Sequence, residues 1–194
     1  MRQRLAHLAS NILNPFLVGL AVIILISFKA ASGALDVLKW SLIITSLSIL
    51  PVYLATLYLV RSRKVDSLFV NIRKQRTKVY LFAGACAVVG WGILLYFGAP
   101  KLLVATFVTG IIAVSVFTLV NLRWKISVHT AWMAASVTVL IILYGWIVAP
   151  ALVLILLVGW ARIELARHSL AQVVAGALFA ALIAFGVFSI SGLV

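Results

Sequence analysis

Long apolar runs constrain this chain more than any other feature of its sequence. Seven runs follow one another and cover approximately residues 12–28, 40–60, 79–97, 102–120, 129–148, 150–162 and 169–192. About 20 helical residues cross the hydrocarbon core of a bilayer, and no polar stretch between the runs is long enough for a soluble domain. We therefore predict an all-α fold: a polytopic transmembrane bundle of six to seven membrane helices, with any active site at one membrane face.

The organisation expected from these runs is a single transmembrane domain over residues 1–194. Within it we expect an N-terminal helical hairpin over 1–60 and a core over 61–194. The sequences FGAPK at 97–101 and IVAPA at 147–151 each combine a small residue with proline between two apolar runs. Both are typical of tight turns between helices.

The cations are distributed unevenly along the chain. If the apolar runs alternate in direction, thirteen of the sixteen Lys and Arg residues fall with the N-terminus and the loops 61–78, 121–128 and 162–168, and three fall on the other side. Cytoplasmic loops carry the excess of positive charge in membrane proteins, so we predict that these loops are cytoplasmic. A net charge of +13 confined to membrane loops favours anionic membrane lipids, and not nucleic acid, as partners.

Acidic residues are too scarce to build a metal centre. The chain has only three, Asp36, Asp66 and Glu164, and they are far apart in the sequence. Magnesium sites and two-metal hydrolases need several carboxylates close together. We therefore expect no metal and no cofactor, and any chemistry must use cationic groups and imidazoles. For Glu164 we expect an ion pair with Arg162 or Arg167.

The most polar stretch inside the apolar sequence is GWARIELARHSLAQVVAG, residues 159–176. His168 lies four residues before Gln172, so the two share one face of a helix and the amide can orient the imidazole. His129 begins another apolar run on the same predicted side. A lone histidine there can equally mark the membrane interface. Arginine with two imidazoles suits a phosphate ester, because Arg binds phosphate oxygens and imidazole serves as nucleophile or acid.

These residues resemble the type 2 phosphatidic acid phosphatase superfamily of integral membrane phosphatases. The third motif of that family is Ser-Arg, five residues, His, three residues, Asp. Arg162 and His168 match it, whereas Ala161 and Gln172 replace the Ser and the Asp. In having Gln at this position the chain resembles the glucose-6-phosphatase and dolichyl-diphosphatase branches of the family.

The other two motifs of the family match less well. The second, Pro-Ser-Gly-His, is matched in its Ser and His by Ser127 and His129 of the sequence ISVH. The first, Lys, six residues, Arg-Pro, has no clean counterpart. Arg73 and Arg76 of the basic loop 61–78 are the best candidates.

The resemblance implies a membrane lipid phosphatase that removes phosphate from an isoprenoid (di)phosphate or a phosphatidate-like lipid through a phosphohistidine. His168 would be the nucleophile, oriented by Gln172, and His129 the general acid. The groups that would bind the substrate phosphate are Arg162, Ser127, Lys125, Arg73 and Arg76. The departures at 161 and 172 support an alternative, a catalytically degenerate member that binds anionic lipid or a partner protein without turnover. The oligomeric state and the chain length of the lipid stay open.

Overall fold

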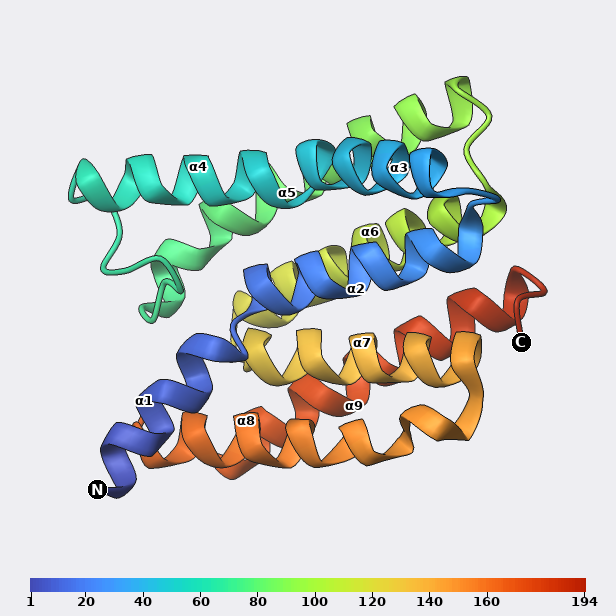
Figure 1. Cartoon of the computed structure of the whole chain (residues 1–194). Helices are drawn as coiled ribbons and strands as arrows, with labels where there is room; N and C mark the ends of the chain where they lie inside the picture. Colours follow the sequence, from blue (N-terminus) through green and yellow to red (C-terminus); the bar gives the residue numbers. More distant parts are fainter. The chain divides into compact units, whose positions relative to one another are not determined.

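A computed structural model describes residues 1–194, and it confirms the all-α class because it contains helices and no strands. Figure 1 shows its elements, which are α1 (Arg2–Ile12), α2 (Pro15–Ala30), α3 (Ala34–Leu47), α4 (Ile49–Arg61), α5 (Arg73–Tyr96), α6 (Lys101–Asn121), α7 (Val128–Tyr144), the 3-10 helix η1 (Gly145–Ala151), α8 (Leu152–Glu164) and α9 (Leu170–Ile190). Five helical stretches are long and apolar enough to cross a membrane, or six if the bent pair α1 and α2 is one span. The chain is an integral membrane protein of the helical type.

The chain divides into two compact units. One comprises Met1–Leu25 together with Ile126–Val194, and the other comprises Ile26–Lys125. We call them the terminal unit and the central unit. Residue 60, where we expected the hairpin to end and the core to begin, lies within α4 (Ile49–Arg61), and this division stays a prediction. The single domain stays a prediction.

The central unit contains α3 to α6. α3 begins at Ala34, before the apolar run expected from residue 40, so only three residues separate α2 from α3. Ser48 separates α3 from α4. Pro51, three residues later, has no N–H, and its ring crowds the carbonyl of the residue four positions earlier. The break in the helix therefore falls one turn before the proline.

The turn predicted at 97–101 is confirmed between α5 and α6. Gly98 has a φ of +61°, and the N–H of Ala99 donates to the carbonyl of Leu94 at 2.9 Å. A left-handed residue in this pattern is the usual way in which a helix ends, and glycine adopts it without strain. α5 and α6 then pack against each other as a hairpin.

The terminal unit is built around α7, which packs against both α8 and α9. The turn predicted at 147–151 is confirmed as part of η1, where Gly145 has a φ of +75°. The helical stretch Val128–Glu164 therefore reverses direction, and α8 returns along α7 (Figure 1). Met133 and Val137 of α7 meet Val158 of α8 in the buried core of this hairpin.

An additional helix, α1, precedes the first apolar run, where we expected no separate element. It meets α2 at a bend of 43°. Asn14 lies at the bend, and its side-chain oxygen accepts hydrogen bonds from the N–H groups of Phe16 (2.9 Å) and Leu17 (3.1 Å). Asn at the N-cap followed by Pro15 at the first helical position is a strong start signal. α2 therefore starts anew, and α1 packs on α8.

Candidate functional site

The beginnings of α7 and α9 touch each other. The N–H of Ser127 donates to the carbonyl of Gln172 at 3.2 Å, and the hydroxyl of Thr130 donates to the carbonyl of Val173 at 3.2 Å. Gly176 makes this approach possible. A Cβ on Gly176 would lie 2.7 Å from the carbonyl oxygen of Ser127, which is too close for any side chain. The contact holds the start of α7, which contains His129, beside the start of α9, which follows His168.

Ser127 and His129 lie at the start of α7. The hydroxyl of Ser127 accepts the N–H of Thr130 at 3.5 Å and so caps the helix. The Ser127 side chain has no solvent exposure, and His129 is 4% exposed. Both polar groups are therefore enclosed in the terminal unit and do not mark the surface of a helix end.

His168 stands just before α9, next to a capping box. The hydroxyl of Ser169 accepts the N–H of Gln172 (3.4 Å), and Oε1 of Gln172 accepts the N–H of Ser169 (3.3 Å). The same Oε1 lies 3.1 Å from Nδ1 of His168. Because Oε1 is a hydrogen-bond acceptor, it needs a proton on Nδ1 of His168. In a neutral imidazole the proton therefore lies on Nδ1 and the lone pair on Nε2.

Arg162 is joined to His168 through the backbone at the end of α8. The carbonyl of Arg162 accepts the N–H groups of Arg167 (3.1 Å) and His168 (3.2 Å). Ala166 lies between them with a φ of +51°, a conformation in which a residue other than glycine is strained. This tight end of α8 holds the main chain of His168 against that of Arg162.

The side chain of Arg162 is buried, with 3% exposure, and its Nη1 donates to the hydroxyl of Ser10 at 3.0 Å. Sequence reasoning missed Ser10, which lies in α1, 152 residues away. The available signal was weak: Ala6 and Ser10 are small residues four apart, and they form the buried face of α1. A second link joins the same helices, because Arg2 forms an ion pair with Glu164 at 3.2 Å. The sequence did not suggest this partner for Glu164.

Three of the residues predicted to bind phosphate lie in the central unit. Nη1 of Arg73 donates to the carbonyls of Asn121 (2.6 Å) and Leu122 (2.5 Å) at the end of α6. Nε of Arg76 donates to the carbonyl of Val70 at 2.6 Å, and the residue is buried. Lys125 follows α6 and is half-buried. Both arginines thus make backbone contacts inside the central unit, and a role for these three residues in phosphate binding stays a prediction.

The three carboxylates are engaged at separate places. Asp36 pairs with Lys39 at 2.8 Å, and Glu164 pairs with Arg2. Partial burial acts to raise the pKa of Asp66, but hydrogen bonds from Asn71, Ile72 and Ser67 outweigh it and hold that pKa below its ordinary value. No group of three or more His, Cys, Asp or Glu side chains comes together in the structure.

The positions that correspond to the second and third motifs all lie in the terminal unit, namely Ser127, His129, Ala161, Arg162, His168 and Gln172. Ala161, which stands in place of the motif's serine, is fully buried. No protein-family model, no curated protein and no solved structure matches this chain.

Proposed function

We propose that this protein is a membrane lipid phosphatase that cleaves a phosphate or diphosphate from a lipid through a phosphohistidine intermediate. The observation that carries the proposal is the environment of His168. Its imidazole is buried, its Nδ1 lies 3.1 Å from an amide oxygen, and its main chain is bound to the carbonyl of Arg162. A neutral imidazole fixed in this tautomer presents Nε2 as the nucleophile.

The proposed reaction has two steps. In the first, the lone pair of Nε2 of His168 attacks phosphorus, a P–N bond forms, and the P–O bond to the lipid breaks. His129 gives its proton to the lipid oxygen that leaves. In the second, water attacks the phosphohistidine and gives a proton to His129, the P–N bond breaks, and inorganic phosphate is released. The guanidinium of Arg162 and the region of Ser127 bind the phosphate oxygens.

The neutral amide of Gln172 orients the imidazole but adds no negative charge to stabilise an imidazolium. This favours the neutral nucleophile in the ground state and gives less help once positive charge develops on it. The buried Ala161 removes a hydroxyl that could donate to phosphate. Both features support the second candidate, a protein that retains the fold and binds an anionic lipid without turnover.

The proposed substrate is an isoprenoid diphosphate or a phosphatidate-like lipid, with the isoprenoid preferred. A site at the helix ends lets a lipid headgroup enter from the side while its chains stay in the bilayer. The predicted cytoplasmic position of the loops 61–78, 121–128 and 162–168 suits a lipid made on that leaflet.

The test is release of phosphate by the purified chain from an isoprenoid diphosphate and from phosphatidate. His168→Ala should abolish release from every substrate, because no covalent intermediate can form. His129→Ala should reduce hydrolysis of an alkyl phosphate by about 10²–10⁴-fold and that of p-nitrophenyl phosphate much less. His7→Ala is the matched control, since His7 is exposed in α1 and should leave activity unchanged.

Trapping of the intermediate assigns the two histidines. Acid-labile phosphate on the protein should persist in His129→Ala and vanish in His168→Ala. Phosphate that depends on His129 alone would reverse the assignment. Retention of lipid binding with no release by the wild type would favour the degenerate candidate, and loss of activity in EDTA that a divalent ion restores would refute the metal-independent mechanism.

A further inference from the structure

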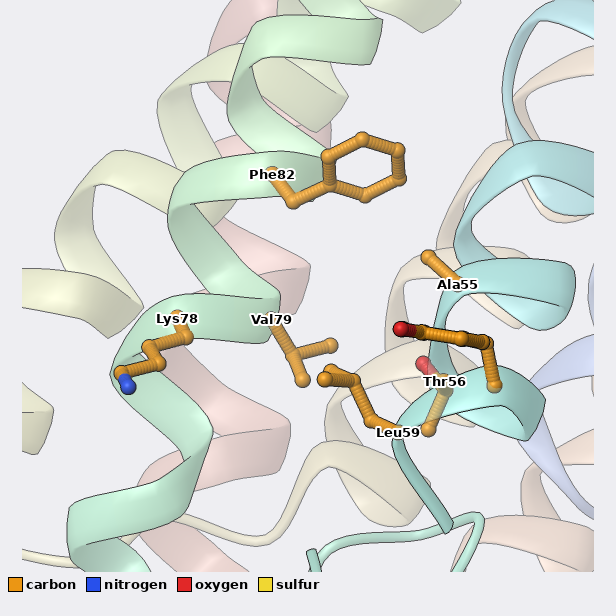
Figure 2. Close-up of a pocket in the computed structure, with 7 residues that line it drawn as sticks. Ala55, Thr56, Leu59, Lys78, Val79 and Phe82 are labelled. Carbon is orange, nitrogen blue, oxygen red and sulfur yellow. The ribbon is translucent and has the colours of Figure 1, made fainter. Parts of the chain in front are cut away.

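A cavity lies between α4 and α5 in the central unit. Its volume is about 220 Å³, and it is lined by Ala55, Thr56, Tyr58, Leu59, Lys78, Val79 and Phe82. Figure 2 shows Val79 and Phe82 of α5 on one side and Ala55 and Leu59 of α4 on the other, with Val79 pointing toward Leu59. A water-sized group fills about 30 Å³, so the cavity has room for several methylene-sized groups.

The walls of the cavity are apolar. Thr56 is the most buried wall residue, with 1% exposure, and its hydroxyl donates to the carbonyl of Val52 at 2.7 Å. The polar atom is therefore satisfied by its own helix and offers nothing to a ligand. Tyr58 and Phe82 form exposed parts of the lining, with 63% and 43% exposure. The cavity is thus a hydrocarbon-lined groove that opens on the surface of the central unit.

Two lysines lie next to residues that line this groove. The stem of Lys78 lines it, and Figure 2 shows the ammonium turned away from the apolar walls. The ammonium of Lys64 lies 5.8 Å from the ring centre of Tyr58, another lining residue. Lysines with apolar stems along a groove and charged heads at the interface are a common arrangement at membrane surfaces. The segment 61–78 contains seven cations and one acid, Asp66.

We propose that this groove binds one acyl chain of an anionic phospholipid, whose headgroup phosphate is held by Lys78 and Lys64. The apolar walls match the chain, and the two lysines beside the groove match the headgroup. Each basic residue near an anionic surface contributes about 1 kcal/mol, which is about fivefold in affinity. The site therefore prefers anionic over zwitterionic lipid. It is independent of the proposed phosphatase chemistry, because it uses none of those residues.

The experiment uses the full chain in phosphatidylcholine vesicles that contain a trace of phosphatidylglycerol with a diazirine in its acyl chain. A parallel sample contains phosphatidylcholine with the same labelled chain. After irradiation, peptide mapping should find the label on α4 and α5 at Ala55, Leu59, Val79 and Phe82. Labelling there should be about fivefold or more higher with phosphatidylglycerol. Equal labelling by both lipids, or label spread evenly over all helices, would overturn the proposal.

Two variants separate the headgroup from the chain. Lys78→Gln should lower labelling by phosphatidylglycerol about fivefold, whereas Lys101→Gln removes the same charge at the opposite end of the α5–α6 hairpin and should change nothing. Ala55→Phe should fill the groove and abolish labelling of Leu59 and Val79 by either lipid. Equal effects of the two lysine variants, or unchanged labelling in Ala55→Phe, would contradict the assignment.

Other occupants give different results. Excess inorganic phosphate at constant ionic strength should leave the label in place, because the chain holds the lipid, and displacement by phosphate would show a plain anion site. A covalent dimer through α4 or α5 in place of the lipid adduct would show that a second copy fills the groove. Both results would refute the lipid assignment. The labelling of the wild-type protein tests the proposal even if a variant fails to fold.

Discussion

Substitution of Gly176 tests the contact on which the candidate site depends. A Cβ at this position would lie 2.7 Å from the carbonyl oxygen of Ser127, 3.0 Å from Cγ2 of Ile126 and 3.2 Å from Oγ1 of Thr130. The nearest atom belongs to the backbone and cannot rotate away. It also accepts the N–H of Ala131 at 3.1 Å. In Gly176→Ala the start of α9 must therefore move away from the start of α7.

The cost follows from three contributions. Overpacking of a tight contact costs about 1–3 kcal/mol. Weakening of the hydrogen bond between Ser127 and Gln172 adds about 0.5–1.5 kcal/mol. Replacement of glycine by alanine inside a helix returns about 0.5–1 kcal/mol. Gly176→Ala should therefore lower the free energy of unfolding by about 0.5–4 kcal/mol.

Two further glycines serve as controls. Gly186 lies in the same helix, and a Cβ there meets nothing within 4 Å, so Gly186→Ala should stabilise the protein by about 0.5–1 kcal/mol. At Gly159 the nearest atom is Cγ1 of Val173 at 2.9 Å. This methyl group can move, so Gly159→Ala should have an effect between the other two.

The assay is unfolding of the purified protein in mixed micelles by titration with dodecyl sulfate, followed by far-ultraviolet circular dichroism. Phosphate release by each variant is measured in parallel. Gly176→Ala should be the least stable of the three and should lose phosphatase activity, because the shift separates the helix starts that hold the two histidines. Equal stability of Gly176→Ala and Gly186→Ala would refute the close approach of α7 and α9.

Three further predictions concern single side chains. Ser10→Ala should destabilise the protein by about 1.5–3 kcal/mol, because the buried, charged guanidinium of Arg162 loses the hydroxyl that accepts its hydrogen bond. Unfolding in dodecyl sulfate measures this loss of stability. Gln172→Glu places a carboxylate beside His168 and favours its protonated form, so the acid limb of the pH–rate profile should move to higher pH, and an unmoved limb would contradict the nucleophile assignment. Ser67→Cys, in a background without the native cysteine, should react with an impermeant thiol reagent only after cells are opened, whereas labelling of intact cells would reverse the predicted orientation.

Much of the fold could be predicted because its causes are local. An apolar run of about 20 residues forms a membrane helix in any context, since every backbone group must be satisfied within the segment. The turns at Gly98 and at η1 could be predicted because glycine and proline determine the backbone conformation of the few residues around them. The position of Gln172 four residues after His168 likewise placed both on one helical face before any tertiary contact was known.

Contacts between distant segments were decided only by the tertiary structure. Nothing in the local sequence shows that Ser10 reaches Arg162, because α1 is short and its buried face consists of small residues that carry no hydrophobic signal. Only the structure shows that the guanidinium of Arg73 binds the carbonyls at the end of α6, and its role in phosphate binding stays a prediction. The partner of each of these side chains depends on which helix ends meet, and packing between helices far apart in the chain determines which ends meet. The glycine at 176 could be recognised as small, but only the approach of α7 shows why no larger residue fits there.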